Sequence, residues 1–221
     1  RVHRGHGPVL PGPGSDVMLN RPNAAWRAGL ALCVGALLRP SDAAAHLVTT
    51  GMGPVYDGIG HLLLTPEDLV PVLALALFAG LRGAAQGRRA MFLLPVAWLA
   101  GGLIGLRVEA TLPFPVAAFS FLILGALVAA DIRLPANGVA VLAVVLGLVH
   151  GVLNGTALRQ GAGGLGLLGI MAALFVLVAL ASAFVVSLER PWARVAVRVA
   201  GSWVAASGLL LLGWAFRGPS S

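Results

Sequence analysis

The chain has 221 residues, of which 58% are hydrophobic and only 10% are charged, and its mean hydropathy is +0.93. A soluble domain of this length cannot hide so much apolar surface in one core. The composition therefore excludes a soluble protein and predicts an all-α integral membrane protein. The formal charge of +7 comes from arginines, because the chain has no lysine. Most of these arginines lie between apolar runs, where they orient helices across a membrane, so we expect no nucleic-acid partner.

The N-terminal region differs in character from the rest of the chain. Residues 1–17 are rich in Gly and Pro without a periodic apolar face, and we interpret them as a non-native extension or a misplaced start, with Met18 as the plausible first residue. Residues 18–45 have the pattern of a secretory signal peptide, with a basic start, an apolar run over 28–38 and three alanines at the end. That run is short for a membrane span, which needs about 20 residues, although an uncleaved anchor is the alternative.

Cleavage after Ala45 would leave residues 46–221 as the membrane domain, with His46 at its N-terminus. A terminal histidine offers both its α-amine and its imidazole to a divalent ion. His46 is therefore a candidate metal ligand, on condition that cleavage occurs at this site.

Apolar segments separated by connections with Arg and Gly predict a bundle of six transmembrane helices in the membrane domain. The segments cover 62–81, 91–106, 114–130, 139–157, 164–187 and 195–216. A short likeness between LRGAAQG at 81–87 and LRQGAGG at 158–164 indicates a possible repeat of three plus three helices, as in many transporters.

The arginines predict the orientation of this bundle. If the mature N-terminus is exported, one side of the membrane receives Arg82, Arg88, Arg89, Arg133, Arg190, Arg194 and Arg198, and the other receives Arg107, Arg159 and Arg217. The first side should face the cytoplasm, because cytoplasmic connections carry an excess of positive residues. We therefore expect a multi-pass protein of the bacterial cytoplasmic (inner) membrane with both mature termini on the periplasmic side.

Glycines in two of the predicted spans form smooth stripes. Gly147, Gly151 and Gly155 follow one another at four-residue steps in the fourth span, and Gly101 and Gly105 repeat the spacing in the second. Such stripes allow a neighbouring helix to approach closely.

The first predicted span contains a candidate metal ligand, His61, followed by two acids, Glu67 and Asp68. In one unbroken helix the acids would lie roughly 9 to 10.5 Å from His61 along the axis, too far to share an ion. However, Thr65 and Pro66 are typical of a helix start, so His61 could lie on a turn that folds back toward the acids. The alternatives are that the acids only stabilise the helix N-terminus and that His61 lies at the membrane interface.

The fourth predicted span contains His150 in its middle and Asn154 one turn later on the same face. One interpretation is a hydrogen bond between helices, and the other is a metal or proton site. Imidazole with carboxylate and amide oxygens suits a borderline divalent ion such as Ni²⁺, Co²⁺ or Zn²⁺.

These histidine motifs resemble those of the HupE/UreJ family of hydrogenase- and urease-accessory membrane proteins, viewed as nickel or cobalt permeases. The first-span motif of that family, a histidine followed six positions later by Asp-His, is similar to His61 followed by Glu67 and Asp68. Here Glu-Asp replaces Asp-His. The resemblance covers nearly all of the mature chain, and it implies a six-span permease with its metal ligands in the first and fourth spans.

The fourth-span motif of the family, Phe-His-Gly-x-Ala-His-x-x-Glu, is similar to Val149-His150-Gly151 followed by Asn154 and Ala157. Asn154 stands where the motif has its second histidine, and Ala157 where it has glutamate. Together with the first-span differences, these replacements imply a site that is richer in oxygen ligands than the family's.

We therefore expect secondary transport of a divalent transition-metal cation, nickel or cobalt, to supply metalloenzyme maturation, with no permanently bound cofactor. The alternative is a non-transporting accessory or structural membrane protein that docks a partner through its glycine-striped helices. No phosphate-binding glycine loop is present, and Ala205-Ala206-Ser207-Gly208 matches only part of a serine-protease motif, so we expect no enzyme. The expected partners are the cation and the lipid bilayer, and a homo-oligomer is a further possible assembly.

Overall fold

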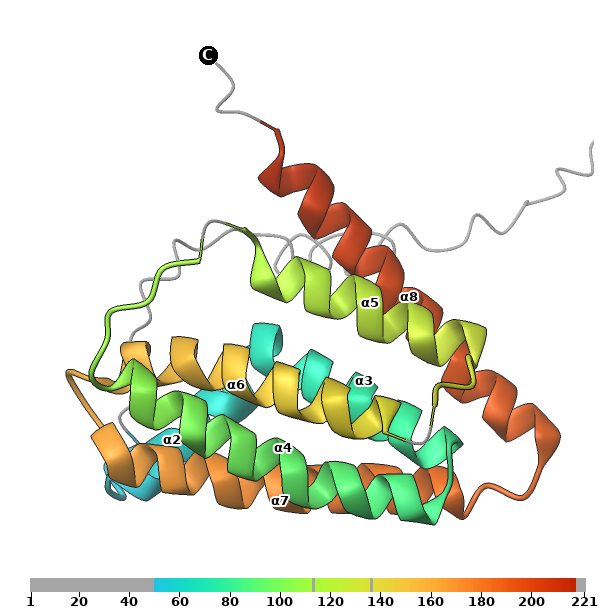
Figure 1. Ribbon diagram of the computed structural model, residues 1–221, viewed down its shortest axis with the longest axis horizontal. Helices are drawn as coiled ribbons and strands as arrows, with labels where there is room; N and C mark the ends of the chain where they lie inside the picture. Colours follow the sequence, from blue (N-terminus) through green and yellow to red (C-terminus); the bar gives the residue numbers. More distant parts are fainter. Residues whose placement is uncertain (1–49, 113, 136, 218–221) are drawn as a thin grey trace, which may run out of the picture. The chain divides into compact units, whose positions relative to one another are not determined.

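The computed structural model describes residues 50–112, 114–135 and 137–217, and these residues form α-helices without any strand (Figure 1). This confirms the predicted all-α class. The helices are α2 (Pro54–Leu64), α3 (Pro66–Leu81), α4 (Ala84–Gly105), α5 (Val116–Ala130), α6 (Gly138–Leu158), α7 (Gly163–Val186) and α8 (Pro191–Ala215). The predicted extension, the signal peptide and His46 lie outside the described residues.

Each of the six predicted spans corresponds to a helix, and the first, 62–81, contains α3 and the end of α2. Two helices, α2 and α3, meet there at an angle of 76°, because the chain breaks at Thr65 before Pro66. By length and apolar composition α6, α7 and α8 qualify as membrane spans among the described residues, and the bent α2–α3 pair makes a fourth. The chain is thus a multi-pass membrane protein, while the six-span bundle and the three-plus-three repeat stay predictions.

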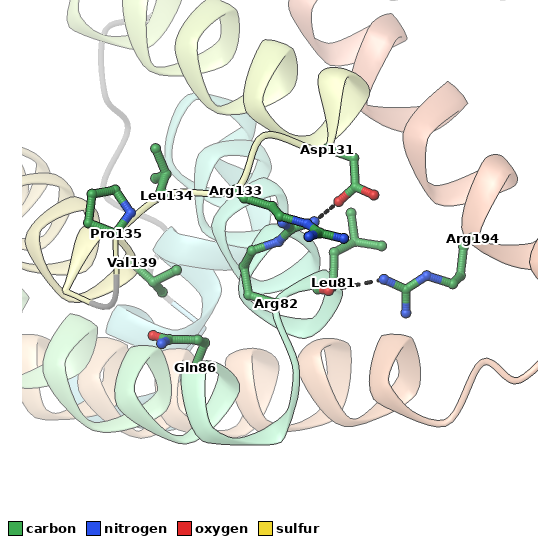
Figure 2. Close-up of a pocket in the computed structure, with 9 residues that line it drawn as sticks. All are labelled: Leu81, Arg82, Gln86, Asp131, Arg133, Leu134, Pro135, Val139 and Arg194. Atoms are coloured by element: carbon green, nitrogen blue, oxygen red, sulfur yellow. Dashed lines mark hydrogen bonds and ion pairs between the residues drawn. The ribbon is translucent and has the colours of Figure 1, made fainter.

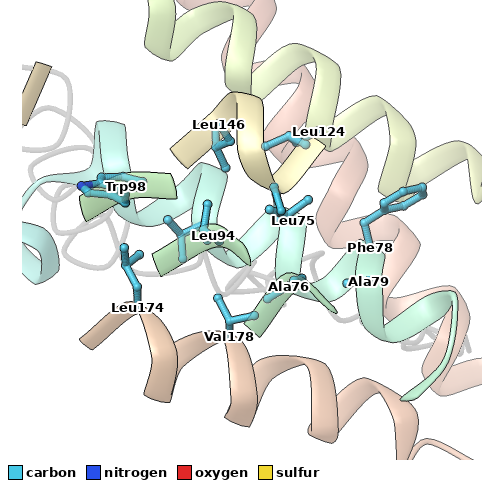
Figure 3. Packing of buried hydrophobic residues seen from close by; sticks show 14 of the residues in the cluster. Leu75, Ala76, Phe78, Ala79, Leu94, Trp98, Leu124, Leu146, Leu174 and Val178 are labelled. Carbon is cyan, nitrogen blue, oxygen red and sulfur yellow. The ribbon is translucent and has the colours of Figure 1, made fainter. Parts of the chain in front are cut away.

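Helix α3 lies at the centre of the described helices and contacts each of the others. Its apolar side chains Leu75 and Phe78 are fully buried. Figure 3 shows residues of α3 surrounded by side chains of four other helices, among them Leu94 and Trp98 of α4, Leu124 of α5, Leu146 of α6 and Leu174 of α7. The core therefore forms around a helix that is only 16 residues long.

The glycine stripes predicted on the second and fourth spans face each other where α4 packs on α6. A Cβ atom at Gly151 would overlap the carbonyl oxygen of Trp98, and one at Gly155 would overlap that of Gly102. Gly101 and Gly105 of α4 contact the backbone of α6 in the same way. The two backbones are therefore in direct contact, and this stripe of α6 is covered within the chain.

Helices α5 and α8 form a second closely packed pair, side by side in Figure 1. Gly125 of α5 lies against the backbone of α8, and Gly208 of α8 lies against that of α5. The opposite face of α8 carries exposed aromatic and aliphatic side chains, including Trp203, Leu210 and Trp214. An exposed apolar face of this extent suits contact with lipid.

We expect Gly151→Ala to destabilise the protein by about 1–3 kcal/mol, because its Cβ has no room against α4. The midpoint of heat-induced aggregation of the detergent-solubilised protein, followed by size-exclusion chromatography, should fall by several degrees. The matched control is Gly164→Ala, where a Cβ would meet nothing within 4 Å. Equal midpoints for the two variants would contradict the close packing of α4 on α6.

Candidate functional site

The break between α2 and α3 determines where the first-span candidates lie. As predicted, Thr65 occupies the N-cap position of α3, Pro66 is its first residue, and Glu67 and Asp68 lie in its first turn. The N–H groups of Asp68 and the next residue donate to the Thr65 carbonyl at 3.1 and 3.0 Å. His61 lies in the last turn of α2 and is buried. The bend between α2 and α3 places His61, Glu67 and Asp68 around the same cavity.

One cavity of about 410 Å³ collects the candidate residues of both predicted spans. Its polar lining includes His61, Glu67, Asp68, His150 and Asn154. The opposite wall comes from the start of α5 and from Leu211 of α8. The structure therefore brings together every predicted metal ligand except His46, and we call this space the histidine cavity.

A hydrogen-bonded network of three buried side chains crosses from α3 to α6. His150 Nδ1 lies 2.7 Å from one carboxylate oxygen of Asp68, and the Asn154 amide donates to the other oxygen at 2.8 Å. The Asn154 amide also donates to the His150 carbonyl at 3.1 Å, one turn back on α6. Asp68 thus does more than favour the positive end of its own helix, since it joins two helices.

The second ring nitrogen of His150 points toward a residue that the sequence analysis missed. Ser120 of α5 places its Oγ 2.9 Å from His150 Nε2. An ionised carboxylate only accepts hydrogen bonds, so Nδ1 donates to Asp68, and in the neutral ring Nε2 then accepts from Ser120. The available signal was modest: Ser120 is the one hydroxyl within the apolar α5 helix.

Trp98 of α4 fixes the plane of the His150 ring from another direction. The indole and imidazole centroids lie 5.5 Å apart with the rings tilted by 33°. The Trp98 side chain is almost completely buried. The imidazole is therefore held by contacts from α3, α4 and α5 at once.

The remaining candidates are less constrained. The side chains of His61 and Glu67 form no hydrogen bond with the described residues, and Glu67 is exposed. The Oδ1 atom of Asn154 is buried without a hydrogen-bond partner. No group of three or more His, Cys, Asp or Glu side chains is close enough to hold a metal in this part of the chain. The cavity thus contains the oriented imidazole of His150 and the amide oxygen of Asn154, which has no hydrogen-bond partner. It also contains the side chains of His61 and Glu67.

Comparison with protein-family models gives a match to the HupE / UreJ protein family over residues 34–211. The chain belongs to the HupE/UreJ family. Comparisons with curated proteins and with solved structures gave no match. The six positions at which the two family motifs have His, Asp or Glu all line the histidine cavity, and in this HupE/UreJ chain they are His61, Glu67, Asp68, His150, Asn154 and Ala157.

The Asp68–His150 pair should show strong energetic coupling, because removing either partner leaves the other buried without its hydrogen bond. We expect the double variant Asp68→Leu/His150→Leu to be more stable than the sum of the single variants implies, by about 1–3 kcal/mol. The free energy of unfolding in mixed detergent micelles is measured for the wild type, the two single variants and the double variant, which together form a double-mutant cycle. Asp68→Leu combined with Ser202→Ala, on the exposed surface of α8, should be additive. Additivity in both cycles would exclude the pairing.

Proposed function

We propose that this chain is a secondary transporter of a divalent transition-metal cation, nickel or cobalt, rather than an enzyme. Membership of the HupE/UreJ family supports this function. The observation that carries it is that the six positions with His, Asp or Glu in the family motifs all lie around a single cavity. We further propose the cytoplasmic membrane as its location, with both mature termini on the outer side and metalloenzyme maturation as the use of the ion.

The ligand that we assign to the cation is the Nε2 atom of His150. A metal-bound histidine commonly donates its other ring N–H to a carboxylate, which fixes the tautomer and raises the basicity of the ligand. Asp68 stands in that relation to His150, at 2.7 Å from Nδ1. Rotation of the Ser120 hydroxyl away from Nε2 would free the lone pair for the ion.

Other residues of the histidine cavity would complete a weak ligand set. The buried Oδ1 of Asn154 has no hydrogen-bond partner, so it can serve as a neutral oxygen ligand. His61 and Glu67, on either side of the α2–α3 break, supply a second imidazole and a charge. Mixed nitrogen and oxygen ligands suit Ni²⁺ or Co²⁺, and a transport site must also release its ion.

The alternative of a non-transporting accessory protein loses the surface that suggested it. That protein would dock a partner through its glycine-striped helices, and α4 covers the α6 stripe at Gly147, Gly151 and Gly155. Backbone contact with α4 uses the space that a partner would need at these glycines, which supports transport over docking.

Elemental analysis of cells tests the proposal directly. Cells that express the protein should accumulate nickel or cobalt several-fold above empty-vector cells when exposed to low nickel, cobalt, zinc and manganese. His150→Ala should abolish the gain at matched expression, because it removes the assigned ligand. The control Glu189→Gln alters an exposed carboxylate outside the cavity and should retain the gain. Full accumulation by His150→Ala would refute the assignment.

Asp68→Asn separates the orienting role of the carboxylate from the ligand role of the imidazole. A carboxamide keeps the shape of Asp68 but loses its charge, so we expect a rise of about 10–100-fold in the metal concentration for half-maximal uptake. The concentration dependence of uptake provides this value. A half-saturation unchanged from wild type would mean that Asp68 does not prepare His150 for the ion.

A further inference from the structure

The ends of the helices remote from the histidine cavity enclose a second cavity of about 390 Å³ that the proposed transport does not use. Three arginines from different segments line it: Arg82 after α3, Arg133 after α5 and Arg194 in the first turn of α8 (Figure 2). We call it the arginine pocket. Its volume is within the range of small-molecule sites, which is about 300–1,000 Å³.

The charges of the arginine pocket do not balance. Asp131 forms an ion pair with Arg82 and is the one carboxylate in the lining. Arg194 donates to the Leu81 carbonyl at 3.0 Å, which is a neutral acceptor. Arg133 is exposed and forms no ion pair or hydrogen bond with the described residues. Two positive charges therefore lack a counter-ion within the described part of the pocket.

Backbone dipoles add to this positive potential. Gln86, Val139 and Arg194, which line the pocket, lie in the first turns of α4, α6 and α8. The N-terminal end of a helix carries a partial positive charge and favours anions. Three such ends meeting beside three arginines cannot be neutralised by one carboxylate.

The excess positive charge affects the pKa of the Arg82 guanidinium. Burial lowers its pKa, and the charges of Arg133 and Arg194 lower it further. Its Nε–H is buried and has no hydrogen-bond partner among the described residues. A buried donor without an acceptor is costly, which an anion in the pocket would relieve.

We propose that the arginine pocket binds the phosphate group of an anionic ligand, a phospholipid headgroup at the membrane surface. The planar guanidinium group matches phosphate oxygens in a two-pronged geometry, which an ammonium group does not. Basic pockets between membrane helices are suited to acidic headgroups. The same chemistry would also accept free phosphate, so the experiment separates the two sources.

The test uses the full chain in a neutral detergent and measures the midpoint of heat-induced aggregation. Added phosphatidylglycerol should raise the midpoint, whereas phosphatidylcholine, whose phosphate is balanced by choline, should not. Arg133→Gln and Arg194→Gln should each raise the phosphatidylglycerol concentration for half-maximal protection about tenfold, as expected for loss of a charge-assisted hydrogen bond. Protection by inorganic phosphate with the same dependence on arginine would identify free phosphate as the ligand.

The matched control is Arg107→Gln, which removes the same charge from an exposed residue at the other end of α4. It should leave the protection unchanged. Arg133 forms no ion pair or hydrogen bond with the described residues, so Arg133→Gln keeps the test valid even where Arg194→Gln fails to fold. Equal protection by the two lipids, or equal effects of Arg133→Gln and Arg107→Gln, would overturn the proposal.

Discussion

The buried carboxylate of Asp68 is the constraint on which the rest of the structure depends. A charge inside an apolar helical protein is costly unless its oxygens have partners. Both partners of Asp68 come from α6, at positions 82 and 86 residues further along the chain. This pairing fixes the start of α3 against the middle of α6. Because α3 contacts each of the other described helices, the register of the core follows from it.

Close backbone packing makes this network possible. Gly151 follows His150 on α6, and it is this residue that allows the Trp98 backbone of α4 to reach α6. The Trp98 ring then lies against the imidazole of His150. One contact between two helices thus both builds the core and sets the plane of the candidate ligand. The glycine stripe is part of the site's construction and not a separate feature.

The sequence predicted those features that depend on neighbours along the chain. The apolar runs predicted the helices, Thr65-Pro66 predicted the start of α3, and four-residue spacing placed His150 and Asn154 on one face. It did not predict α2 as a helix, because residues 54–61 form no continuous apolar run and the first predicted span began at residue 62. Nor did it find Ser120 or the pairing of Asp68 with His150, since those contacts join residues far apart in sequence.

Both cavities lie at the same boundary, the interface between the α5–α8 pair and the other described helices. The histidine cavity has the α5–α8 pair on one side and α2, α3 and α6 on the other. The arginine pocket lies between Asp131, Arg133 and Arg194 on one side and α3, α4 and α6 on the other. Polar contacts cross this boundary near both cavities: the bond of Ser120 to His150, the ion pair of Arg82 with Asp131 and the bond of Arg194 to Leu81.

Helix α3 spans the distance between the cavities, roughly 24 Å at 1.5 Å per residue. Its N-terminus is held by the Asp68 network and its C-terminus by Arg194. Rotation of the Ser120 hydroxyl on α5 would free His150 Nε2 without moving α3, whereas a shift of α3 would break the buried carboxylate pairing. Since Asp131, the C-cap of α5, lines the arginine pocket, the helix that carries Ser120 contributes to both cavities.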